Sequence, residues 1–167
     1  MGDDLTVTAG PVVRTDDAGM YAGYATFYPA DLMLDFFTYG GAWSTNQLGG
    51  TGTGLGAVYT IGDSGFSVSG NYVARNGSDD DGGIGTDESN YTSSWQLFYD
   101  GELFDGSFQA QAGYAVNRGV GFTMATQAND ITDSDNYSLA AAWKPADSGL
   151  MPSISTGYSV SNDSDDT

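Results

Sequence analysis

The residues that could do chemistry in this 167-residue chain are carboxylates, tyrosines and lysine, because it contains neither histidine nor cysteine. That absence excludes thiol nucleophiles, zinc fingers, disulfides and a Ser-His-Asp triad. Paired carboxylates suited to acid–base catalysis occur at Asp87/Glu88 and Asp100/Glu102, but both pairs fall in predicted turns without an apolar wall to raise a pKa. Gly62-Asp63-Ser64-Gly65 is like a serine-protease nucleophile loop, yet without a histidine its residue types predict a hairpin turn. We therefore expect no enzyme, no catalytic residue and no cofactor.

Two further glycine-rich or acidic motifs could bind small ligands. Residues 52–57 match a G-x-G-x-x-A dinucleotide fingerprint, but a strand is expected after them, where nucleotide binding needs a helix. The run 79–88 holds Asp79, Asp80, Asp81 and Asp87 and begins like a calcium-binding nonapeptide, but it has no second copy and fails EF-hand spacing. We expect a solvated outer loop and no metal site. Weak binding of divalent cations between these carboxylates is the alternative.

The overall composition narrows the class of protein. With 22 acidic and 4 basic residues the formal charge is −18, which argues against a nucleic-acid partner. The aromatic fraction of 13% argues against disorder, and few strong helix formers are present, so we expect an all-β fold. No apolar run reaches the ~18 residues of a transmembrane helix. The first residues also lack the features of a secretory signal, and we expect that the natural N-terminus is missing.

Period-two alternation of apolar and polar residues predicts most of the strands. Val73 and Phe98 interrupt this alternation. Residues 19–25 could equally form a short helix in a folded-in loop, so eight or nine strands result. The predicted strands are 54–62, 66–75, 92–100, 106–117, 136–144 and 151–161, with candidates at Leu5 to Val13, Met20 to Phe27 and Leu32 to Tyr39.

The connections between these strands alternate in length, which predicts an antiparallel up-and-down meander. Short turns are expected at 62–65, 100–106 and 145–150, and long acidic loops at 40–53, 76–91 and 118–135. This rhythm of short turns and long loops is typical of outer-membrane β-barrels, whose strands of about 9–11 residues cross the membrane at a tilt. A soluble barrel or sandwich is the competing architecture.

The composition of the two strand faces favours the membrane barrel. The apolar face mixes Ala, Gly, Leu and Val with aromatic residues near strand ends, which suits lipid better than a packed soluble core. The aromatic residues expected at the lipid interface are Tyr72, Trp95, Tyr99, Tyr114, Trp143 and Tyr158. The residues expected to line the lumen are Asn71, Arg75, Gln96, Gln109, Gln111, Lys144, Ser153 and Ser155. The two cationic side chains, Arg75 and Lys144, would lie near opposite ends of the lumen. Pairing with a neighbouring carboxylate is the alternative role of each.

Four stretches carry a resemblance to a known family: Val12 to Asp17, Tyr28 to Asp31, Leu34 to Ala42, and the hairpin Trp143 to Ser155. They resemble the barrel of cyanobacterial outer-membrane porins of the OprB-like carbohydrate-selective group, many of which are described as iron-uptake porins. The resemblance implies passive diffusion of small hydrophilic solutes, such as carbohydrates and inorganic ions including iron, through a water-filled lumen. It also implies an outer-membrane location, contact with outer-membrane lipids and a homotrimer as a candidate assembly.

The same resemblance defines the expected domain organisation. Residues 1–167 are expected to be a single porin β-barrel segment. The signal peptide, the S-layer-homology domain that holds peptidoglycan, and the closing strands of full-length members are not present. Because bacterial barrels close with an even number of strands and the chain ends in an acidic tail, we expect an incomplete barrel.

Two other functions remain open on the sequence alone. The first is a small complete barrel that acts as a structural or adhesive membrane anchor, with its lumen filled by side chains. The second is a soluble β-sandwich binding module that takes calcium or glycans at its acidic loops.

Overall fold

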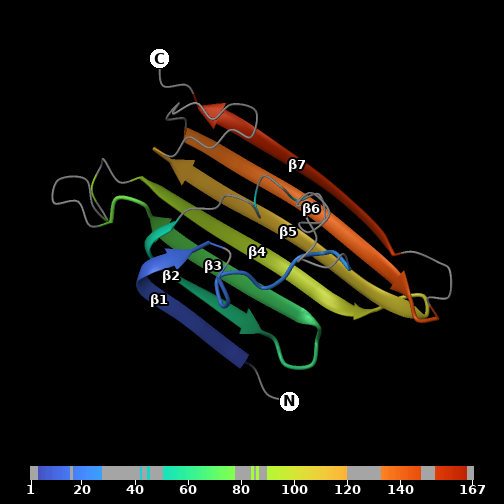
Figure 1. Ribbon diagram of the computed structural model, residues 1–167. Helices are drawn as coiled ribbons and strands as arrows, with labels where there is room; N and C mark the ends of the chain where they lie inside the picture. The colour runs from blue at the N-terminus through green and yellow to red at the C-terminus, as the bar shows by residue number, and fades with distance from the viewer. Residues whose placement is uncertain are drawn as a thin grey trace.

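The computed structural model describes residues 4–15, 17–27, 42, 45, 51–77, 84, 86, 90–119, 133–147 and 153–164. These residues form an all-β fold built on one sheet of seven strands, as Figure 1 shows. The strands are β1 (Asp4–Arg14), β2 (Thr51–Thr60), β3 (Phe66–Ala74), β4 (Tyr91–Glu102), β5 (Gly106–Arg118), β6 (Asp133–Pro145) and β7 (Ile154–Ser164). No helix in this described part of the chain is long and apolar enough to cross a membrane.

The sheet is an antiparallel meander in which each strand pairs with the next along the chain. Its order is β1-β2-β3-β4-β5-β6-β7, and the described residues leave β1 and β7 as its two open edges. The predicted up-and-down meander is therefore confirmed, whereas the described sheet does not close into a barrel. β1 carries a bulge between Gly10 and Val13, where Pro11 removes a ladder donor at an edge that tolerates the loss.

The predicted alternation of connections is also confirmed. Short turns join β2 to β3, β4 to β5 and β6 to β7, and the strands joined by long connections leave and re-enter the sheet at its opposite end. The tightest turn is Phe104-Asp105, where both residues have positive φ (51° and 53°) and Leu103 and Gly106 exchange backbone hydrogen bonds of 2.9 and 3.2 Å. This is the geometry of a type I′ hairpin, whose twist matches that of the strands.

Two of the nine predicted strands need separate comment. The strand predicted at Met20 to Phe27 is wrong, because residues 17–27 form an irregular segment that leaves the sheet and folds back over it. The alternative of a folded-in loop fits that position, although these residues form no helix. The strand predicted at Leu32 to Tyr39 lies outside the described residues.

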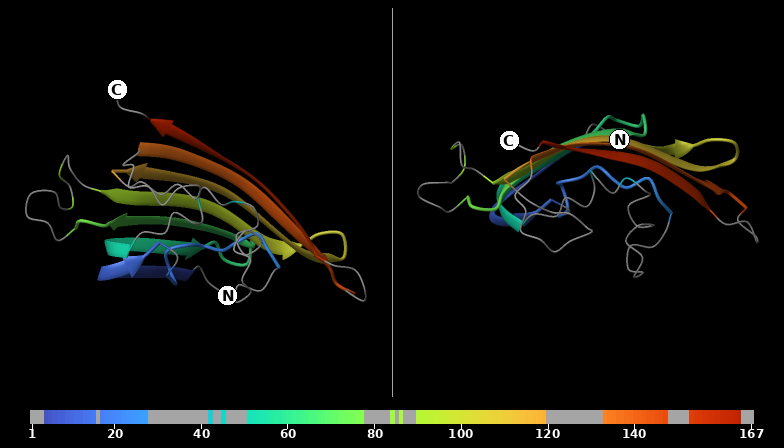
Figure 2. Two further views of the ribbon diagram at one scale, coloured as in Figure 1. Left: turned by 45° about the horizontal axis from the view of Figure 1, so that its top comes forward. Right: turned by 90° about the horizontal axis from the view of Figure 1, so that it is seen from above.

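The sheet is curved, and its two faces differ in what covers them. Figure 2 shows the arch from above, with residues 17–27 (blue) on its inner side. We call that side the concave face and residues 17–27 the inner segment. The other side, the convex face, carries the apolar side chains of the alternation.

Candidate functional site: the polar concave face

The concave face is a continuous polar surface, because the antiparallel register aligns the polar positions of neighbouring strands. Asn71 on β3 pairs with Ser94 on β4, and Ser69 pairs with Gln96 in the next row. These side chains are buried: Gln96 and Asn71 are 4% exposed and Ser94 is 1% exposed. The other buried polar residues of the strands on this face are Ser67, Thr92, Gln111, Asn117, Ser134, Asn136 and Ser138.

Near the long-loop end, these polar side chains hydrogen-bond to one another across three strands. Thr92 Oγ1 donates to Asn117 Oδ1 (2.8 Å), and Asn117 Nδ2 donates to Ser134 Oγ (3.1 Å). Asn136 Nδ2 donates to the same Ser134 Oγ (3.0 Å). The side-chain donors of Thr92, Asn117 and Asn136 are therefore satisfied by other side chains of the wall.

The inner segment begins with a tight turn that reverses the chain after β1. The Arg14 N–H donates to Asp17 Oδ2 (2.7 Å), and the Met20 N–H donates to the Asp17 carbonyl (3.0 Å). Gly19 has φ +84°, and a Cβ there would collide with Thr8 Oγ1 on the concave face of β1. Glycine is therefore needed both for the backbone conformation and for the close approach.

Side chains of the sheet hold the backbone of the inner segment as it crosses the concave face. Gln96 Oε1 accepts from the N–H groups of Ala22 and Gly23 (3.1 and 3.2 Å), while Gln96 Nε2 donates to the Gly23 carbonyl (2.6 Å). The Ala22 N–H also donates to Ser69 Oγ (3.1 Å). Further along, the Ala25 N–H donates to Gln111 Oε1 (3.0 Å).

The two interruptions of the strand alternation lie where the inner segment docks. Val73 is fully buried and packs in one cluster with Met20 and Val13. Phe98 lies against Gly23, where an added Cβ would come within 2.8 Å of its ring. An apolar residue on an otherwise polar strand face was the sequence signal that could have located this docking site.

The structure brings together only part of the predicted lumen-lining set. Asn71, Gln96 and Gln111 lie under the inner segment and contact it or its neighbours. Gln109, Lys144 and Ser155 lie on the same face toward the short-turn end, where Lys144 and Ser155 are exposed, and Ser153 precedes β7. Arg75 follows β3 at the long-loop end. Partial desolvation of its guanidinium lowers the pKa of this group.

The convex face exposes large apolar side chains along the whole sheet. Trp95 and Leu139 are each 61% exposed, and Tyr158 is 68% exposed. Other exposed members on the strands of this face are Leu5, Val7, Leu55, Phe66, Val68, Leu97, Tyr137 and Ile154. The burial of this sheet is thus reversed relative to a water-soluble β-protein, where the apolar face is the covered one.

Aromatic rings gather at both ends of the convex face. At the long-loop end the rings of Tyr72 and Tyr91 stack with centroids 4.9 Å apart, and those of Tyr114 and Tyr137 lie 5.0 Å apart. At the short-turn end the ring centroid of Tyr99 lies 4.8 Å from that of Phe66 and 6.2 Å from that of Phe108. In the same cluster Trp143 Nε1 donates a hydrogen bond to the Leu103 carbonyl (2.8 Å). Of the predicted interface aromatics, Tyr72, Tyr99, Tyr114 and Trp143 belong to these end clusters. Trp95 pairs directly with Tyr114, and Tyr158 pairs with Leu139 nearer the middle of the sheet.

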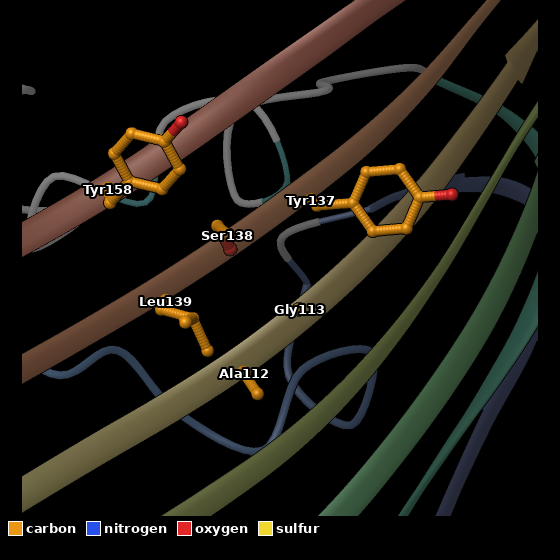
Figure 3. Close-up of a pocket in the computed structure, with 6 residues that line it drawn as sticks. All are labelled: Ala112, Gly113, Tyr137, Ser138, Leu139 and Tyr158. Atoms are coloured by element: carbon orange, nitrogen blue, oxygen red, sulfur yellow. The ribbon is translucent and has the colours of Figure 1, made fainter.

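A shallow apolar hollow lies between the clusters on the convex face. It has a volume of about 350 Å³, and Figure 3 shows Leu139 and Ala112 to one side of the rings of Tyr137 and Tyr158. Gly113 and Ser138 complete its lining.

The convex face also carries one ion-pair cluster, at the long-loop end. Arg118 lies 3.2 Å from Asp135 and 3.8 Å from Asp133, and the Tyr114 hydroxyl donates to Asp135 Oδ1 (2.9 Å). These charges lie beyond the apolar band.

The candidate catalytic and metal residues do not form a site within the described part of the chain. Asp100 and Glu102 are both exposed, and Asp100 accepts a hydrogen bond from Gln109 (3.0 Å). No group of three or more acidic residues suited to a metal ion occurs among the described residues. The pair Asp87/Glu88 and the candidate cation loop with Asp79, Asp80, Asp81 and Asp87 lie outside them.

Comparison of this chain with protein-family models, curated proteins and solved structures gives no match.

Proposed function

We propose that this chain forms part of the wall of an outer-membrane porin, with its convex face toward lipid and its concave face toward an aqueous lumen. The observation that carries the proposal is the reversed burial of the sheet. Trp95 is 61% exposed on one face, while Gln96, the next residue, is 4% exposed on the other.

The energetic argument starts from the convex face. In water each large apolar side chain left exposed forgoes about 1.5–3 kcal/mol of burial free energy, and a continuous exposed apolar surface marks a membrane or protein contact. Lipid satisfies such a surface without interdigitated packing, which suits the mixture of Ala112, Ala141, Leu97 and Leu139 on it.

The aromatic clusters support the same orientation. Tyr91 and Tyr99 lie at the two ends of β4, about 27 Å apart at about 3.4 Å per residue. At a strand tilt of about 40° this becomes about 21 Å along the membrane normal, close to the ~25 Å apolar band between the aromatic girdles of outer-membrane barrels. The ion pair of Arg118 and Asp135 then falls at the level of the long-loop girdle, where Arg118 pairs with Tyr91.

The concave face suits small hydrophilic solutes. Its polar groups in the described strands are mostly amides and hydroxyls. Together with the resemblance to cyanobacterial OprB-like porins, this favours passive diffusion of carbohydrates and inorganic ions, including iron, across an outer membrane. A homotrimer is the assembly that the resemblance suggests.

A second candidate is a structural barrel that inserts in the membrane but does not conduct. The inner segment favours it, because it covers the polar groups that a conducting lumen would present to solute.

Liposome swelling in sugars of increasing size tests the proposal. We expect vesicles that contain the chain to swell in a pentose and more slowly in a tri- or tetrasaccharide. The variant Gln96→Leu, which weakens docking of the inner segment, should swell faster. If the wild-type chain and Gln96→Leu both insert but neither lets the vesicles swell, the porin proposal is rejected and the structural barrel remains. A chain that stays in the aqueous fraction would reject both.

A further inference from the structure

The inner segment crosses the sheet obliquely, from one strand to the next. Its contacts pass from β1 at Ala18, through β3 and β4 at Ala22, to β5 at Ala25. A solute that moved along the concave face in the strand direction would therefore meet this segment on its way. Figure 2 shows this blue chain on the inner side of the arch.

The segment is held by side chains and takes no part in the β-ladder. Thr8, Ser69, Asn71, Gln96 and Gln111 each bond its backbone through a hydroxyl or an amide. Because the strands pair only with one another, release of the segment would break these side-chain bonds and leave every ladder hydrogen bond in place. The inner segment can therefore leave the sheet without a change in strand pairing.

The segment carries small residues where it meets the sheet. Ala22, Gly23 and Ala25 lie at the amide contacts, and the Ala25 side chain packs with Ala140. Met20, fully buried beside Val73, anchors it with a large side chain, and the Tyr21 hydroxyl donates to the Thr45 carbonyl. Beyond these anchors, side-chain hydrogen bonds from the sheet hold the backbone of the segment.

We propose that the inner segment is an internal plug: docked on Gln96 and Gln111 it closes the path along the concave face, and undocked it opens that path. This inference rests on the porin function proposed above. The docked side-chain amides are the same groups that an open lumen would offer to water and polar solutes, so solute and segment compete for one surface.

The direct test locks the plug with a disulfide. The chain has no native cysteine, so Ala22→Cys with Ser69→Cys introduces a single pair. The Ala22 N–H lies 3.1 Å from Ser69 Oγ, which brings the two positions within reach of a disulfide. In planar bilayers we expect little current from the oxidised double variant and recovery on addition of a reductant. Each single-cysteine variant cannot form the bond within the chain, so its current should not change when the reductant is added.

A second pair of variants tests the plug without a disulfide. Gln96→Leu removes the amide clamp, whereas Thr60→Val removes a hydroxyl of the same face that bonds Ser67 and not the segment. Loss of about 1.4 kcal/mol of docking free energy would raise the open fraction about tenfold. We expect that rise for Gln96→Leu and no change for Thr60→Val.

The possible results separate the two proposals. Equal currents from oxidised and reduced protein, with Gln96→Leu like the wild type, would overturn the plug and leave the porin in place. An absence of current from every variant in either redox state would overturn the porin and the plug with it.

Discussion

Replacement of Leu139 by arginine should destabilise the protein strongly in a bilayer and scarcely in water. Leu139 is 61% exposed in the middle of the convex face, between the aromatic clusters. Ile154 is a matched control, because it is 62% exposed on the same face but lies at the short-turn end. Arginine on the lipid face of an outer-membrane barrel costs about 2–4 kcal/mol at the midplane and about 0–1 kcal/mol near the interface.

The two variants should therefore differ by about 2–3 kcal/mol in free energy of unfolding from vesicles. The assay is equilibrium unfolding of the chain in phospholipid vesicles by guanidinium, followed by tryptophan fluorescence. For a soluble sheet both substitutions would replace an exposed side chain and stay within about 0.5 kcal/mol of the wild type. Equal stability of Leu139→Arg and Ile154→Arg in vesicles would refute the lipid-facing assignment of the convex face.

Three smaller predictions follow from local geometry. Gly19→Ala should destabilise the docked inner segment by about 1–3 kcal/mol, because of its positive φ and the collision with Thr8, and faster hydrogen exchange of the Ala25 amide would report it. Phe104→Asn should raise the free energy of unfolding by about 0.5–1 kcal/mol, since asparagine tolerates the positive φ of a type I′ turn, and a higher denaturant midpoint would report it. Tyr114→Phe should cost about 1 kcal/mol in the same unfolding assay through loss of the bond to Asp135.

The strands and their faces could be predicted because a sheet imposes a period of two on its sequence. In β5 the alternation of Gln109 and Gln111 with Ala110 and Ala112 fixes both the strand and the side to which each residue points. The short and long connections could be predicted for a similar reason, since glycine and aspartate mark tight turns.

The inner segment could not be predicted with the same rules. Residues 20–27 mix tyrosine, alanine and glycine in a strand-like pattern, but their backbone groups bond Gln96 and Gln111 in place of a neighbouring strand. Which partner a backbone takes depends on side chains more than 70 residues away in the sequence, and local patterns contain no such information. The start of β6 was missed because Asp133 and Asp135 look like loop residues, whereas Arg118 accommodates both within the strand.

The central claim is that the convex face meets lipid, and the fluorescence of Trp95 tests it most directly. A variant with Trp95 as its single tryptophan can be reconstituted in vesicles whose lipids carry bromine at mid-chain, and compared with quenching by aqueous iodide. Because Trp95 is 61% exposed on the apolar convex face, beside Tyr114, we expect strong quenching by the brominated lipid and little by iodide. Strong quenching by iodide with none by the brominated lipid would contradict it.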